Sequence, residues 1–113
     1  MSWIGVELII EGLEELCDRQ VQEKLWLSDG SSDVSSFSEA VEKLFTDSAL
    51  GSALDSESTG YSPALVDSFR ELRTQVAKID QNRAPAIILN DPILLDIRSL
   101  SVKTLHLLKQ QLL

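Results

Sequence analysis

Carboxylates crowd the beginning of the chain at spacings that could do chemistry. Glu7 and Glu11 stand four residues apart, as do Glu14 and Asp18, so a helix would place each pair on adjacent turns. Facing helices bind di-metal clusters through such glutamates when a Glu-x-x-His motif completes the ligand set. Cys17, rather than a histidine, occupies the third position after Glu14. The sequence therefore predicts no metal at these carboxylates.

The chain has one histidine, His106, and one cysteine, Cys17, so most nucleophilic mechanisms would depend on a single side chain. We expect His106 to be a solvated residue of the last helix. Cys17 lies on the apolar side of an acidic helix, which does not activate a thiol, and is predicted to be a small buried hydrophobe. The P-loop, GxGxxG and GxSxG motifs are absent. We predict no catalytic residue, no cofactor and no metal, and hence that the protein is not an enzyme.

The acids lie on a segment, 3–24, that is expected to form one amphipathic helix. At about 100° per residue, its apolar side chains gather opposite its acids. Gly12 costs about 1 kcal/mol relative to alanine, and it either permits close approach of another helix or has no role. Glu15 and Arg19 are spaced to pair across one turn. Residues 21–28 keep neither period, so a helix to about residue 24 and a short extended piece both remain open before a serine-rich loop over 28–40, and the conformation of 22–36 is left undecided.

The acidic side of this helix is the surface with a candidate function. Acidic side chains steer a basic protein toward a docking site and raise the association rate, although a solvated helix face would have the same composition. Trp3 and Trp26 could anchor a partner, because tryptophan is enriched at binding hot spots, but a core position is the better prediction. The candidate partner-binding residues are Glu7, Glu11, Glu14, Glu15 and Asp18.

The overall charge limits the kinds of partner. The chain of 113 residues has a formal net charge of −8 with 10 basic residues, which argues against nucleic acid because phosphate contacts require clustered Lys and Arg. No window approaches the roughly 20 apolar residues of a membrane-spanning helix, and the N-terminus lacks the basic region of a signal peptide. We expect a single helical domain, 1–113, that lies in the cytoplasm and has no membrane partner.

Three further helices complete the predicted fold. Ser36 begins a capping box for a helix over 37–46, and Asp47 could cap a short helix over 48–55. Ser62-Pro63 and Asp91-Pro92 are strong helix starts, while 85–90 could form a helical turn or a short strand. The fold class is therefore all-α: a compact bundle of four main helices, 3–24, 37–46, 63–79 and 92–111, with one or two short helical turns.

In size, acidity and helical composition the chain resembles the immunity proteins with which bacteria neutralise toxins. The resemblance implies a cytosolic inhibitor that occludes a basic toxin or nuclease with acidic side chains, and it transfers no site residue. An immunity-type inhibitor is therefore the leading interpretation. The alternative is a structural or assembly domain that docks a partner through apolar surface or self-associates as a homo-oligomer, suggested by Leu107, Leu112 and Leu113.

Overall fold

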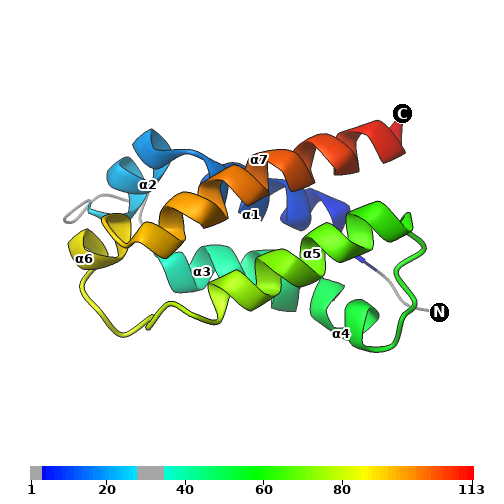
Figure 1. Cartoon of the computed structure of the whole chain (residues 1–113), viewed down its shortest axis with the longest axis horizontal. Helices are drawn as coiled ribbons and strands as arrows, with labels where there is room; N and C mark the ends of the chain where they lie inside the picture. Colours follow the sequence, from blue (N-terminus) through cyan, green and yellow to red (C-terminus); the bar gives the residue numbers. More distant parts are fainter. Residues whose placement is uncertain (1–3, 28–34) are drawn as a thin grey trace.

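A computed structural model describes residues 4–27 and 35–113, and this part of the chain is helical without any strand (Figure 1). The all-α fold class is confirmed. The molecule measures 40 × 28 × 25 Å. The helices are α1 (Val6–Cys17), α2 (Arg19–Trp26), α3 (Phe37–Val41), α4 (Leu50–Asp55), α5 (Pro63–Val76), α6 (Pro85–Leu89) and α7 (Pro92–Leu112), with a π-helix, η1 (Glu42–Asp47), between α3 and α4.

The core lies between α1, α5 and α7, because α7 packs against both of the other two helices. Figure 1 shows α2 and α6 at one end of this layer and α4 near the other. Ser68 and Thr104 hydrogen-bond at 2.6 Å across the α5–α7 contact, so these two buried hydroxyls are partners for each other. The fully buried large side chains of these three helices are Ile9, Leu13, Leu16, Leu65, Phe69, Leu72, Leu94, Ile97 and Leu108.

The predicted helix over 3–24 is wrong as one element, because the structure divides it into α1 and α2. Asp18 has an extended backbone, with φ −124° and ψ 111°, and its side chain accepts from the backbone N–H of Gln20 and of Val21. Asp18 is thus an N-cap, which favours ending α1 and starting a new helix. The open question about residues 22–26 is settled as helix. Trp3 and residues 28–34, where the sequence predicts a loop, lie outside the described residues.

Gly12 marks the closest approach of α1 to the α3–η1 segment. A Cβ at this position would lie 2.8 Å from Cβ of Leu44 and 3.2 Å from the carbonyl oxygen of Ala40. Of the two interpretations of Gly12, close approach is therefore the one that the structure shows. The predicted helix over 37–46 exists and begins at the Ser36 cap, which accepts from the Glu39 N–H at 3.1 Å. Its second half is the π-helix η1.

The remaining predicted boundaries need small corrections. The backbone N–H of Leu50 donates to the hydroxyl of Ser48 at 3.1 Å. The side chain that accepts a hydrogen bond from the first residue of α4 is therefore that of Ser48, and not that of Asp47 as predicted. The α5 helix ends at Val76 rather than at residue 79, although Ile79 is still buried. The segment 85–89 is helical, which settles the choice between helix and strand. The last helix, α7, begins at Pro92 as predicted.

Candidate partner-binding surface

Three of the five predicted acids form an exposed row along α1. Glu7, Glu11 and Glu14 are all exposed, and their spacing of four and three residues places them on one side of the helix. We call these three residues the acidic row. The opposite side of α1 is fixed in the core by Ile9 and Leu13. The helix therefore presents the three glutamates to solvent from fixed backbone positions.

Lys43 of η1 lies beside the acidic row. Its Nζ is 3.9 Å from Oε2 of Glu11 and 3.9 Å from Oε1 of Glu15. The Lys43 side chain is 32% exposed and that of Glu11 is 59% exposed, so water screens this contact and makes it weak. Glu7 and Glu14 have no ion pair within the described ranges. The negative charge of the row is therefore only partly offset.

Glu15 does not belong to the exposed surface. The prediction that it binds a partner together with the other four acids is therefore corrected. The residue is 5% exposed. Its Oε2 accepts from Nε1 of Trp26 at 2.8 Å and from the hydroxyl of Ser35 at 2.7 Å. At about 100° per residue, Glu15 lies on the flank of the acidic row that faces α3 and η1. Neighbouring elements cover that flank, so Glu15 holds structure together instead of meeting a partner.

Trp26 occupies the core, as predicted, and explains why Glu15 is buried there. The indole is 5% exposed and meets the ring of Phe37 edge to face, with ring centroids 6.0 Å apart. A buried indole N–H needs an acceptor, and the Glu15 carboxylate supplies it. The predicted core position of Trp26 was the signal that some acceptor had to lie nearby. Nothing in the sequence alone connects that need with Glu15.

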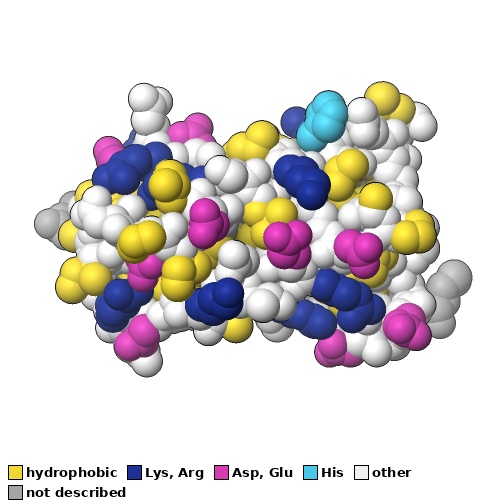
Figure 2. Space-filling model, viewed as in Figure 1, with side chains coloured by type: hydrophobic (Ala, Val, Ile, Leu, Met, Phe, Trp, Pro, Cys, Tyr) yellow, Lys and Arg dark blue, Asp and Glu magenta, His cyan; other side chains and the backbone are white. Residues whose placement is uncertain are grey.

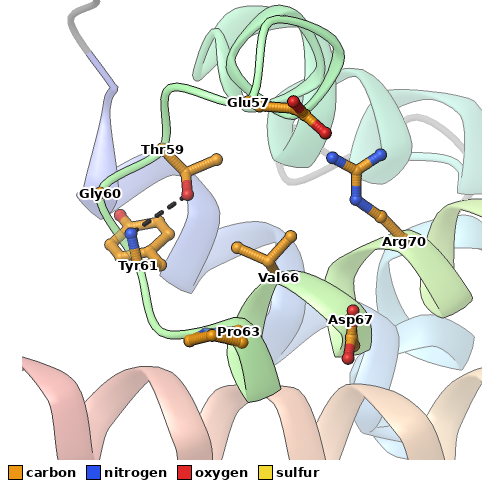
Figure 3. A pocket seen from close by; sticks show the side chains of 8 residues that line it. All are labelled: Glu57, Thr59, Gly60, Tyr61, Pro63, Val66, Asp67 and Arg70. Carbon is orange, nitrogen blue, oxygen red and sulfur yellow. Dashed lines mark hydrogen bonds between the residues drawn. The ribbon is translucent and has the colours of Figure 1, made fainter.

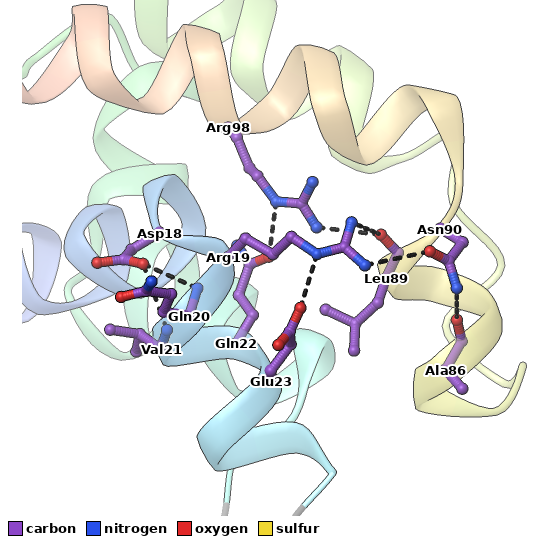
Figure 4. A network of polar contacts seen from close by, with 10 residues as sticks. All are labelled: Asp18, Arg19, Gln20, Val21, Gln22, Glu23, Ala86, Leu89, Asn90 and Arg98. Carbon is purple, nitrogen blue, oxygen red and sulfur yellow. Dashed lines mark hydrogen bonds and ion pairs between the residues drawn. The ribbon is translucent and has the colours of Figure 1, made fainter.

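Asp18 is exposed but is already used by the fold. Its Oδ1 accepts from the backbone N–H of Gln20 at 2.9 Å and from that of Val21 at 3.3 Å (Figure 4). Because the chain leaves the helical path at Asp18, this carboxylate does not continue the acidic row along the α1 axis. The predicted stripe of five acids is thus reduced to three, with Asp18 at its end as a helix cap.

A polar network joins α2 to α6 and α7, next to the Asp18 cap (Figure 4). Arg19 pairs with Glu23 at 2.7 Å and not, as predicted, with Glu15. Its guanidinium also donates to the carbonyl oxygen of Leu89. Arg98 of α7 donates to Oε1 of Gln22 at 2.8 Å and to the same Leu89 carbonyl at 3.0 Å. These contacts fix α2, and with it Trp26, against the rest of the bundle.

The two lone nucleophilic side chains show no activated setting. Cys17, predicted to be a small buried hydrophobe, is half-buried, and its thiol donates to the carbonyl oxygen of Glu14 at 3.3 Å. Burial, followed by the negative charge of Asp18, raises the pKa of the Cys17 thiol, which disfavours the reactive thiolate. His106 is exposed on α7. Among the described residues, no three His, Cys, Asp or Glu side chains are grouped to hold a metal ion.

A hollow of about 530 Å³ lies between the α4–α5 connection and α5 (Figure 3). Arg70 on its rim donates to the carbonyl oxygen of Leu54 at 2.8 Å. Burial raises the pKa of the Tyr61 phenol, which packs against Phe69 with ring centroids 6.0 Å apart. Charges of both signs line the hollow, so it favours no single class of ligand. The lining residues are Glu57, Thr59, Gly60, Tyr61, Pro63, Val66, Asp67 and Arg70.

Comparisons with protein families, with curated proteins and with solved structures find no match to this chain. Across the described ranges, no helix is both long and apolar enough to cross a membrane. What the structure defines is thus an all-α bundle that presents an acidic row on α1. The function has to be inferred from that surface.

Proposed function

We propose that the protein is a small, non-catalytic binding protein of the cytoplasm that captures a basic protein partner on the acidic row of α1. The observation that carries the proposal is the exposure of Glu7, Glu11 and Glu14 side by side, with Lys43 as the one base within 4.0 Å of the row among the described residues. Carboxylates arranged in this way attract a basic surface and accelerate its encounter.

The rigidity of α1 supports the proposal. The helix is packed against α7 on one side and against η1 on another, where Gly12 permits the closest contact. The backbone that carries the three glutamates is consequently ordered before a partner arrives, which lowers the entropy that binding must offset. Within this proposal, Glu15 is a positioning residue. It holds Trp26 through a hydrogen bond and has no exposed surface for the partner.

The more specific form of the proposal is an immunity-type inhibitor, in which the acidic row covers the basic cleft of a toxin or nuclease. A nuclease that binds phosphate with Lys and Arg offers the charge that this surface complements. The net charge of −8 agrees with such a partner and opposes direct binding to nucleic acid.

Affinity capture from a lysate of the source organism tests the proposal with three forms of the protein. The wild type is compared with Glu7→Lys/Glu14→Lys, which reverses two charges of the acidic row. The matched control, Asp67→Lys/Glu71→Lys, makes the same change in net charge at exposed positions of α5. We expect a basic protein to be retained by the wild type and by the control, and to be lost with the α1 variant. Equal retention by all three forms would remove the acidic row from the account.

A further inference from the structure

The outward side of α7 exposes large apolar side chains in a regular pattern. Leu95 is 62% exposed and Val102 is 54% exposed. They stand seven residues apart. Ser99 lies four residues after Leu95, His106 lies four residues after Val102, and both are exposed. All four residues therefore share one side of the helix. We call these four residues the outer stripe. Figure 2 views the molecule from the side of α7 and shows hydrophobic side chains interspersed with charged ones.

The outer stripe differs from the apolar surface expected from the sequence. Leu107 packs against the core, and only Leu112 and Leu113 of the predicted residues are exposed. The stripe lies nearer the middle of α7, where it continues for about three helical turns. An exposed leucine alone carries no meaning on a protein surface. The position of this leucine relative to the neighbouring charges is what indicates an interface.

Asp96 and Lys103 flank the outer stripe on the same side and are also seven residues apart. Both are exposed, and neither forms an ion pair with any residue in the described ranges. Opposite charges seven residues apart on one helix become partners when a second copy of that helix lies antiparallel. A two-fold axis midway between Ser99 and Leu100 places each Asp96 level with Lys103 of the second copy.

The same axis also interdigitates the apolar side chains. At about 1.5 Å per residue, Leu95 lies about 3 Å from the level of Val102 and about 3 Å from the level of His106 in the second copy. Val102 lies midway between the levels of Leu95 and Ser99 of that copy. Leu95 and Val102 therefore each face a gap between side chains of the second copy, as in knobs-into-holes packing. One register satisfies both the charges and the apolar contacts.

We propose that the outer stripe of α7 pairs two copies of this chain antiparallel about this two-fold axis, with reciprocal Asp96–Lys103 ion pairs. Such an interface is closed, because the same patch is used on both copies. A stripe of three turns buries less than the roughly 1,200 Å² of stable complexes, so the dimer is a weak one that depends on concentration. The stripe shares no residue with the acidic row, so this inference is independent of the proposed function.

Sedimentation equilibrium over a concentration series at about 0.15 M salt tests the inference, because this salt screens the net repulsion beyond roughly 8 Å. We expect wild-type protein to associate and Lys103→Asp to associate at least about tenfold more weakly, since it places like charges opposite each other. The charge-swapped Asp96→Lys/Lys103→Asp variant restores the ion pairs and should recover wild-type association. Circular dichroism confirms that each variant is folded.

The control is Lys78→Asp, which makes the same charge change at an exposed residue beyond α5 and should leave association unchanged. Val102→Asp should abolish association by placing a carboxylate in the apolar seam. A wild type that stays monomeric at every concentration overturns the inference. So does a folded Lys103→Asp variant that associates normally, or a folded charge swap that fails to recover association.

Discussion

Replacing Glu15 by alanine should destabilise the fold far more than the same change at an exposed acid one residue away. The Glu15 carboxylate is 5% exposed and accepts from Nε1 of Trp26 at 2.8 Å and from the hydroxyl of Ser35 at 2.7 Å. The substitution leaves the buried indole N–H without its acceptor. Ser35 is only partly buried and can turn to water, so the main cost arises at Trp26.

The expected magnitude follows from the kind of hydrogen bond that is lost. A hydrogen bond to a charged group contributes about 1.5–3 kcal/mol, and a buried donor left without a partner costs about 1–3 kcal/mol. These two quantities overlap, because both describe the same N–H group. We therefore do not add them, and we expect Glu15→Ala to lower the free energy of unfolding by about 1.5–3 kcal/mol. Glu14→Ala, at an exposed position of the same helix, should change it by less than about 0.5 kcal/mol.

Urea unfolding followed by circular dichroism measures both variants on the same scale. Combining Glu15→Ala with Trp26→Phe closes a double-mutant cycle, because phenylalanine keeps an aromatic ring and lacks the N–H. We expect a coupling of about 0.5–3 kcal/mol between these two positions. A Glu15→Ala variant as stable as Glu14→Ala would refute the assignment. It would also return Glu15 to the exposed acidic surface that the sequence suggested.

Three further predictions concern other parts of the fold. Gly12→Ala should stabilise α1 by about 1 kcal/mol through helix propensity, but its new Cβ should force Leu44 away at an overpacking cost of about 1–3 kcal/mol. Thermal unfolding should therefore show that the stability of the protein is unchanged or lower. A clear gain in stability would contradict the close approach of α1 to η1. Asp18→Ala should lower stability to urea by about 1 kcal/mol through loss of the α2 cap, whereas Asp18→Asn should be nearly neutral; equal loss in both would point to charge instead of capping. The hydrogen bond from Arg83 holds the pKa of Asp91 below its usual range, so the stabilisation is present above the unfolded pKa and is lost as pH falls through the lowered folded value. Arg83→Gln should accordingly flatten the acid limb of the stability–pH curve, and an unchanged limb would remove Arg83 as the cause.

The helices with two agreeing signals were predictable from the sequence. At α5 and α7, a serine or aspartate cap stands before a proline, and apolar residues then follow at helical spacing. The predicted first residue of both helices was therefore correct. The end of α5 was placed three residues late because Ile79 is buried without being helical. Periodicity reports burial, and burial continues past the last turn of a helix.

The boundary between α1 and α2 was not predictable from periodicity alone, because the acidic spacing continues through Asp18. An aspartate serves equally as a helical surface residue and as an N-cap, and only the packing of α2 through Gln22 and Trp26 decides between them. Glu15 shows the same limit for the candidate site. A helical projection gives the direction of a side chain but not how far η1 and α3 extend over it.

The association rate between the protein and the basic partner retained in the capture experiment tests the central claim most directly. Stopped-flow measurement compares wild type with Glu7→Lys/Glu14→Lys across a range of salt concentrations. We predict that wild-type association slows as salt rises and that the α1 variant associates at least about tenfold more slowly at low salt. Equal rates and equal salt dependence for the α1 variant and the Asp67→Lys/Glu71→Lys control would contradict the proposal that the acidic row of α1 receives the partner.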